Sequence, residues 1–278
     1  MNGYHELDML MQSVSLADRL TFQEADELSL SVDHARIPTD ERNLVYRAAL
    51  AMQNATGCGK GAAITLYKEI PSEAGMGGGS SDAAVTLRAL NLLWNQNCTE
   101  TDLESIGLSV GADVPFCVRG GLQRVRGIGE QLVPLLPKKT MHILALQPCR
   151  GLSTREVFRA FREQGRNRID TDGVEQALLA GDCEALGRLM GNALEPAAIQ
   201  MRPEIQSAIN LLLKAGACGA RMTGSGSMVF GLYSDADSCC AAMDCIRPQY
   251  PNVRALHTME FGNEIVSLQE SPRERRAE

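Results

Sequence analysis

A glycine-rich run that lies between a strand pattern and a helix pattern constrains this chain more than any other feature. The run reads Pro71-Ser72-Glu73-Ala74-Gly75-Met76-Gly77-Gly78-Gly79-Ser80-Ser81. Before it, residues 62–67 alternate apolar with small or polar side chains, which predicts a strand that Pro71 ends. After it, Ala83, Leu87, Leu90 and Trp94 share one face of a predicted helix.

This strand–loop–helix arrangement predicts a phosphate-binding loop. Glycines let the backbone approach a ligand closely, and a helix N-terminus offers unpaired N–H groups and a positive dipole end. The hydroxyls of Ser80 and Ser81 can add donors, or ligands for a phosphate-bound Mg²⁺. A flexible Gly/Ser turn that binds nothing is the alternative interpretation.

Two common phosphate-loop motifs do not match. A Walker A loop needs Gly-x4-Gly-Lys before Ser or Thr, but Lys60 is followed by Gly61. A dinucleotide fingerprint places glycine at its sixth position, where this run has Ser80. The loop therefore belongs to another class of phosphate site.

The bulk properties exclude several classes of protein. The 278 residues suffice for two modest domains. A net charge of -7 argues against a nucleic-acid binder, and no apolar stretch is long enough to suggest a membrane span or a signal peptide. Nine cysteines form no Cys-x-x-Cys pair, and with four histidines no zinc spacing appears, so we expect mostly buried thiols in a reducing cytosol and no metal ligands.

The remaining pattern mixes strands and helices. Thr99 and Asp102 resemble a capping box of a helix that Gly111 ends. Asp235 can cap a helix that reaches Ile246. We further predict strands at 141–146, 228–233 and 253–259, a helix from about 174 to 189, and another that begins near Pro203 and ends before Gly216. The expected domains are 1–148 and 149–263, followed by a charged, flexible tail at 264–278.

Three further motifs accompany the loop. They read Gly3-Tyr4-His5-Glu6-Leu7, Gly111-Ala112-Asp113-Val114-Pro115-Phe116 and Thr223-Gly224-Ser225-Gly226-Ser227. Taken singly, each can be an ordinary turn or terminus. A carboxylate such as Asp113 can also act as a general base, because a kinase must remove a proton from the hydroxyl that attacks the γ-phosphoryl group.

In this order, the four motifs resemble those of the kinase superfamily that includes galactose, homoserine, mevalonate and phosphomevalonate kinases, with Met76 where leucine is usual. The resemblance implies that residues 71–81 bind Mg²⁺-ATP and that Asp113 is the catalytic base. It also implies that Thr223, Gly224, Ser225 and Gly226 support the phosphate loop. A similar segment, Asn192-Ala193-Leu194-Glu195, suggests no role by its chemistry.

Within this superfamily, the N-terminal motif is similar to that of the diphosphocytidyl-methylerythritol kinases. The resemblance implies that His5 pairs with the edge of cytosine and that Tyr4 encloses the base. It implies a cytoplasmic α/β enzyme that phosphorylates the 2-hydroxyl of a small substrate with a cytidine diphosphate group. The expected architecture is a ribosomal-protein-S5-like kinase domain followed by a ferredoxin-like domain.

The sequence departs from the family at its start. Family members carry a first strand with a Pro-Ala-Lys-Ile-Asn type motif, which this chain does not contain; Lys60 and Lys68 stand in other contexts. We therefore expect an unpaired sheet edge and the loss of a cation where negative charge accumulates. A sister kinase of the superfamily, or a catalytically weak nucleotide-binding homologue, are the alternative hypotheses.

Overall fold

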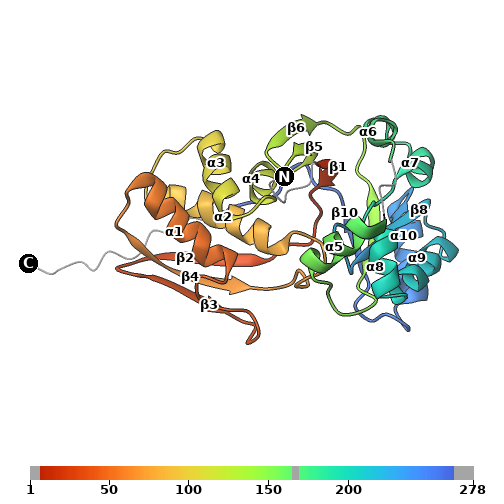
Figure 1. Cartoon of the computed structure of the whole chain (residues 1–278), viewed down its shortest axis with the longest axis horizontal. Coiled ribbons are helices and arrows are strands. Elements are labelled where there is room, and N and C mark those ends of the chain that lie inside the picture. The colour runs from red at the N-terminus through yellow and green to blue at the C-terminus, as the bar shows by residue number, and fades with distance from the viewer. Residues whose placement is uncertain (1–6, 165–168, 266–278) are drawn as a thin grey trace, which may run out of the picture. The chain divides into compact units, whose positions relative to one another are not determined.

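The computed structural model describes residues 7–164 and 169–265, with side chains up to residue 161 in the first range (Figure 1). The chain divides into two compact units. Unit 1 consists of Met1–Ala17, Ile70–Gly77 and Gly121–Glu260; unit 2 consists of Asp18–Glu69, Gly78–Gly120 and Phe261–Glu278. The glycine run thus changes units after Gly77. These two units do not test the domain boundary predicted after Pro148, which stays a prediction.

Unit 1 contains two antiparallel sheets and six helices. The three-stranded sheet has the order β1-β5-β6, with β1 at Leu7–Gln12, β5 at Leu122–Gly127 and β6 at Gln131–Leu135. The four-stranded sheet has β7 at His142–Leu146, β8 at Gly219–Met222, β9 at Val229–Tyr233 and β10 at Arg254–His257. The helices are α5 Thr154–Gln164, α6 Thr171–Ala180, α7 Cys183–Leu189, α8 Glu195–Met201, α9 Glu204–Lys214 and α10 Ala236–Ile246.

The larger sheet has the strand order of a ferredoxin-like fold. Its order is β10-β7-β9-β8, and every neighbouring pair is antiparallel. Counted along the chain from β7, this is 4-1-3-2, with helices between the first and second strands and α10 between the third and fourth. The ferredoxin-like expectation for the second half of the chain is therefore confirmed.

Both faces of this sheet are buried. Leu144 and Leu146 of β7 join a cluster with residues of α8, α9 and α10, whereas Ile143 and Ala145 join a cluster with residues of α6 and α7. The alternation follows from the two-residue period of a strand. Ala74 of the glycine run also belongs to the second cluster. The phosphate loop is therefore anchored in the core of unit 1.

Unit 2 is a three-stranded sheet with helices on one face (Figure 1). Its order is β2-β4-β3, antiparallel for β2–β4 and parallel for β3–β4. The strands are β2 Arg19–Ala25, β3 Leu28–Val32 and β4 Gly61–Tyr67; the helices are α1 Leu44–Thr56, α2 Gly78–Leu93, α3 Glu100–Val110 and α4 Val114–Arg119. Among the described residues, β2 and β3 are the outer strands.

The apolar face predicted after the glycine run is the buried face of α2. Ala83, Leu87 and Leu90 are fully buried, and Trp94, one residue beyond the helix, donates from its indole Nε1–H to the carbonyl oxygen of Gly61 at 3.2 Å. This bond ties the end of α2 to the start of β4. The tryptophan is the only one in the chain, so its environment reports on unit 2.

Several local predictions are confirmed. Thr99 and Asp102 form the capping box of α3, and Gly111 is its C-cap. The Asp235 carboxylate accepts from the Ser238 N–H at the start of α10. The four predicted strands also occur, with ends that differ by up to two residues.

Two expectations were wrong in detail. The helix predicted over 174–189 is two helices, because Gly181 takes a left-handed φ of 69° and Asp182 caps the second one. The helix predicted to begin near Pro203 does occur as α9, with Pro203 as its N-cap residue. Only three of the nine cysteines are buried.

Within the described residues, no helix is both long and apolar enough to cross a membrane.

Candidate active site

The glycine run leads directly into the N-terminus of α2. Gly75 and Gly77 have φ values of 74° and 66°, which a residue with a Cβ adopts only at a cost. Helix α2 begins at Gly78, so the backbone N–H groups of 78–80 have no partner within the helix, and no other described residue accepts a hydrogen bond from them. No acidic residue lies in this first turn. Three free donors and a positive dipole end suit the binding of a phosphate group.

The C-terminal glycine motif lies against the phosphate loop within unit 1. The Thr223 hydroxyl donates to the Gly75 carbonyl oxygen at 3.1 Å, and the Met228 N–H donates to the Ala74 carbonyl oxygen at 3.0 Å. A Cβ on Gly75 would collide with the Thr223 carbonyl oxygen, and one on Gly224 would lie 2.8 Å from the Gly75 carbonyl oxygen. The two glycines therefore permit a close backbone contact. Family resemblance implied that these motifs support one another, and the structure brings them into contact.

The Asn192–Glu195 segment makes hydrogen bonds to the C-terminal motif and to Met222, which precedes it. The Asn192 side-chain amide donates to the carbonyl oxygens of Met222 and Gly224, both at 2.8 Å. The Glu195 carboxylate accepts from the Met222 N–H at 2.8 Å. Burial raises the pKa of Glu195, which the Met222 N–H and Arg221 partly oppose. A continuous set of hydrogen bonds thus runs from Asn192 through the C-terminal motif to Gly75, and sequence reasoning gave this segment no role.

Asp113 occupies the N-cap position of α4 but does not cap it. Its side chain makes no capping hydrogen bond, and its backbone has φ −86° and ψ −10°. Burial raises the pKa of its carboxyl group. A carboxylate that no backbone N–H neutralises, and whose basicity burial increases, suits a proton acceptor.

A buried ion cluster in unit 2 was missed by the sequence interpretation. Lys68 follows β4, Asp18 precedes β2, and the antiparallel pairing of these strands places Arg19 opposite Tyr67 and so brings the two charges together. The Lys68 ammonium pairs with Asp18 and, at 2.8 Å, with Asp82 in the second turn of α2. The three side chains are only 7%, 2% and 5% exposed.

This cluster holds two carboxyl groups for one ammonium group. Burial, and then the neighbouring charge of Asp18, raise the pKa of Asp82 to about 7, against the lowering effect of Lys68. Burial lowers the pKa of Lys68, but the attraction of Asp82 and Asp18 outweighs it, so that pKa is raised. The Asp18 and Asp82 carboxyls also share a hydrogen bond, which requires a proton on one of them. The cluster is neutral when it keeps that proton.

The buried Cys117 thiol is affected by both Asp113 and this cluster. Burial first, and then the charges of Asp113 and Asp82, raise the pKa of Cys117. Both carboxyls therefore lie within electrostatic reach of one buried thiol in unit 2. The only sequence signal for the cluster was Asp82 itself, which follows the two serines of the glycine run.

Tyr4 and His5 lie outside the described residues. The strand that follows them, β1, is held by Arg124 of β5, whose guanidinium donates to the Asp8 carboxylate at 2.7 and 2.8 Å. This pairing lowers the pKa of Asp8, against an opposing effect of burial. Arg124 also pairs with Asp172 and Glu175. The start of β1 is thus fixed by charge pairing.

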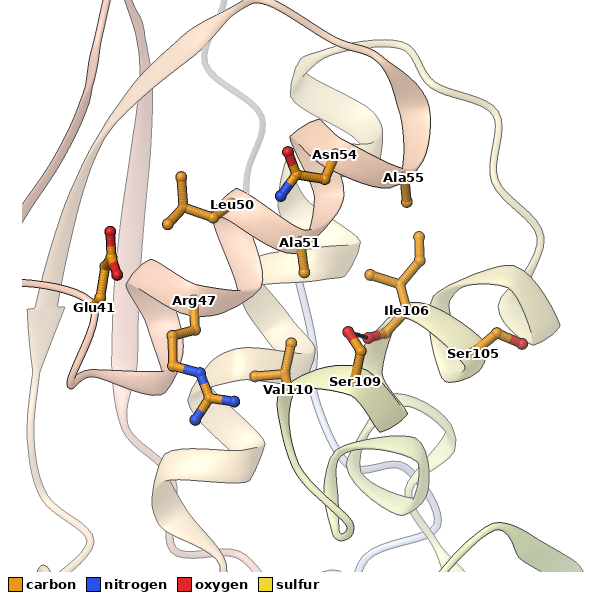
Figure 2. Close-up of a pocket in the computed structure, with 10 residues that line it drawn as sticks. All are labelled: Glu41, Arg47, Leu50, Ala51, Asn54, Ala55, Ser105, Ile106, Ser109 and Val110. Atoms are coloured by element: carbon orange, nitrogen blue, oxygen red, sulfur yellow. Dashed lines mark hydrogen bonds between the residues drawn. The ribbon is translucent and has the colours of Figure 1, made fainter.

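Unit 2 also has a hollow on its surface. It is an open groove of about 680 Å³ between α1 and α3, with Arg47, Asn54 and Ser109 among its lining (Figure 2). The Ser109 hydroxyl donates to the Ile106 carbonyl oxygen at 2.6 Å. None of the predicted site residues lines this groove, so we assign it no role in catalysis. In the described part of the chain, no group of His, Cys, Asp and Glu side chains could hold a metal ion.

Comparisons with known proteins agree with these motifs. Residues 43–121 match the GHMP kinases N terminal domain, and residues 174–246 match the GHMP kinases C terminal domain. The chain is 44% identical to a 4-diphosphocytidyl-2-C-methyl-D-erythritol kinase of Pelotomaculum thermopropionicum, over 85% of this chain and 84% of the relative. It is 39% identical to the enzyme of the same name from Desulfitobacterium hafniense, over 94% and 90% of the two chains.

Solved structures show the same likeness. A crystal structure of 4-(cytidine 5'-diphospho)-2C-methyl-D-erythritol kinase superposes with a TM-score of 0.77 at 33% identity, covering 92% of this chain and 91% of the other. A homoserine kinase from Cytophaga hutchinsonii gives a TM-score of 0.76 at 21% identity, covering 91% and 90%. The second likeness concerns the fold alone.

Proposed function

The chain belongs to the GHMP kinases, among the 4-diphosphocytidyl-2-C-methyl-D-erythritol kinases, and from this membership we propose its reaction. It is a kinase that transfers the γ-phosphoryl group of ATP to the 2-hydroxyl of 4-diphosphocytidyl-2-C-methyl-D-erythritol. This step belongs to the synthesis of isoprenoid precursors. The observation that carries the proposal is the phosphate loop: the C-terminal motif supports its first part at Gly75, and the loop continues into the unpaired N–H groups at the start of α2.

The loop would bind ATP through its backbone. The N–H groups of 78–80 would donate to phosphate oxygens, next to the hydroxyls of Ser80 and Ser81 in the first helical turn. These two hydroxyls fit a phosphate-bound Mg²⁺, which supplies charge neutralisation when it is bound. Residues 71–77, together with Thr223, Gly224, Ser225 and Gly226, complete the proposed nucleotide site.

Asp113 would accept the proton of the attacking hydroxyl. Burial raises the pKa of its carboxyl group, so the carboxylate is a stronger base than an exposed one. The transfer would be direct: the substrate oxygen attacks the γ-phosphorus, ADP leaves, and the hydroxyl proton goes to Asp113. No phosphorylated enzyme is formed.

The contacts behind the loop would set its position. Asn192 and Glu195 hold the backbone of Met222, and Asn192 also holds Gly224, which lies against Gly75. The Lys68–Asp82 pair holds the second turn of α2 against the end of β4. Both sets act on backbone that must remain fixed while charge develops on the phosphates.

Tyr4 and His5 would select the cytidine group, and we expect the enzyme to act in the cytoplasm. A panel of hydroxyl substrates tests the proposed selectivity. ADP release from Mg²⁺-ATP is measured with the diphosphocytidyl substrate, homoserine and mevalonate, each at the same concentration. We expect release with the cytidine substrate alone. Release with homoserine or mevalonate would identify a sister kinase, and nucleotide binding without release would identify a weak homologue.

A further inference from the structure

Two cysteines of unit 1 face each other at short range. The Sγ atoms of Cys183 and Cys218 lie 2.7 Å apart, closer than two non-bonded sulfur atoms normally approach. Cys183 is the first residue of α7, and Cys218 immediately precedes β8. An S–S bond of about 2.05 Å would need them to move by well under an ångström.

The backbone around the two cysteines is already close. A Cβ on Gly187 of α7 would collide with the Cys218 carbonyl oxygen, and one on Gly219 would lie 2.6 Å from the Gly187 carbonyl oxygen. Two glycines therefore let α7 lie directly against the start of β8. The Cys218 N–H donates to the Leu232 carbonyl oxygen at 2.8 Å, which fixes Cys218 to β9. The sulfur contact is thus set by packed secondary structure.

We propose that Cys183 and Cys218 form a reversible intramolecular disulfide, a modification site separate from the kinase reaction. Cys218 is half-buried and Cys183 is buried, so Cys218 meets an oxidant first. Burial, and then the hydrogen bond with Cys218, raise the pKa of Cys183 to about 12. Cys183 is therefore the less reactive thiol and reacts second.

The oxidant is a low-molecular-weight disulfide such as glutathione disulfide. The Cys218 thiolate attacks it, one glutathione leaves, and a mixed disulfide forms. Cys183 then loses its proton and attacks the Cys218 sulfur, and the second glutathione leaves. Two protein thiols are oxidised to one disulfide, one glutathione disulfide is reduced to two thiols, and these carry away the two protons.

The cross-link would join α7 to β8 without moving the kinase site. Strand β8 ends at Met222, whose backbone Asn192 and Glu195 hold, and the sulfurs lie at the other end of that strand. Because the cysteines are already in contact, closing the bond needs no shift of β8. The disulfide would restrict the unfolded chain and so raise the melting temperature.

The test uses the full chain, incubated with glutathione disulfide or with dithiothreitol, then alkylated and digested. We expect a linked peptide pair containing Cys183 and Cys218, two fewer alkylated thiols, and a higher Tm in the oxidised sample. Cys183→Ser and Cys218→Ser should each abolish the linked pair, whereas Cys245→Ser, at an exposed position, should keep it.

Two results would overturn the proposal. One is a wild-type protein that keeps both thiols, or keeps glutathione on Cys218 without going on to the internal disulfide. The other is a linked pair that lowers the Tm, since a native contact should accept the bond without strain. Both results are measured on the wild-type chain. The proposal can therefore be refuted even if a serine variant fails to fold.

Discussion

Replacement of Asp82 by Asn should raise the free energy of unfolding of unit 2, relative to wild type, as the pH rises. The Asp82 carboxyl shares a buried site with Asp18 and only one ammonium group, that of Lys68. Its pKa is raised to about 7 by burial and by Asp18. The folded state thus binds the proton more tightly than the unfolded state, and stability falls as pH rises from about 4 to about 7. An amide imitates the protonated carboxyl: its oxygen accepts from Lys68 and its NH₂ donates to Asp18.

The magnitude follows from the pKa of Asp82. Between pH 5 and pH 8 the wild type crosses about two units of this window, and each unit is worth about 1.4 kcal/mol. The free energy of unfolding of Asp82→Asn, relative to wild type, should therefore rise by about 2–3 kcal/mol over that range. Comparing the two proteins at each pH cancels the titration of groups that do not interact with Asp82.

Urea unfolding followed by the fluorescence of Trp94 measures this difference, because Trp94 is buried in unit 2. Asp244→Asn, an exposed carboxyl on α10, is the matched control and should leave the pH dependence unchanged. Equal pH dependence of Asp82→Asn and wild type would refute the reasoning, as would a relative stability that falls with pH.

Three further predictions concern the proposed catalytic parts. Asp113→Asn should lower kcat by roughly 10²–10⁴-fold with ATP affinity unchanged in calorimetry, and full activity would contradict its role as the base. Asn192→Ala leaves the carbonyl oxygens of Met222 and Gly224 without their donor. If this costs about 1.4 kcal/mol of binding free energy, ATP affinity should fall by about tenfold. An unchanged ATP affinity would contradict the positioning role of Asn192. Gly75→Ala and Gly77→Ala each place an alanine in the left-handed region, which costs about 1–2 kcal/mol. Only the new Cβ at position 75 would also collide with Thr223, so the ATP affinity of Gly75→Ala should fall further than that of Gly77→Ala. Equal losses of ATP affinity would contradict the close contact.

Local features of the fold could be predicted from the sequence, because each depends on residues close in the chain. The capping box at Thr99, the buried face of α2 and the Asp235 cap needed only helical spacing and side-chain chemistry. The split of α6 from α7 was missed because the apolar spacing continues across Gly181, where the backbone turns left-handed. The strand order of the ferredoxin-like sheet was expected from family resemblance alone.

The parts of the site that escaped prediction join distant segments. Lys68 and Asp18 meet because β2 pairs with β4, which no local pattern reveals. Asn192 acts on carbonyl oxygens some thirty residues further along the chain, and backbone groups carry no signal in the sequence. By contrast, the contact between the Thr223 motif and the loop was expected, since family resemblance related both motifs to one site.

The most direct test of the kinase assignment locates the transferred phosphate. The chain is incubated with Mg²⁺-ATP and the diphosphocytidyl methylerythritol substrate, and the product is examined by ³¹P and ¹H NMR. The account predicts a new phosphomonoester on the oxygen of C2, formed in step with ADP and absent without Mg²⁺. A phosphate on another hydroxyl, or ADP formed by hydrolysis with the substrate unchanged, would contradict it.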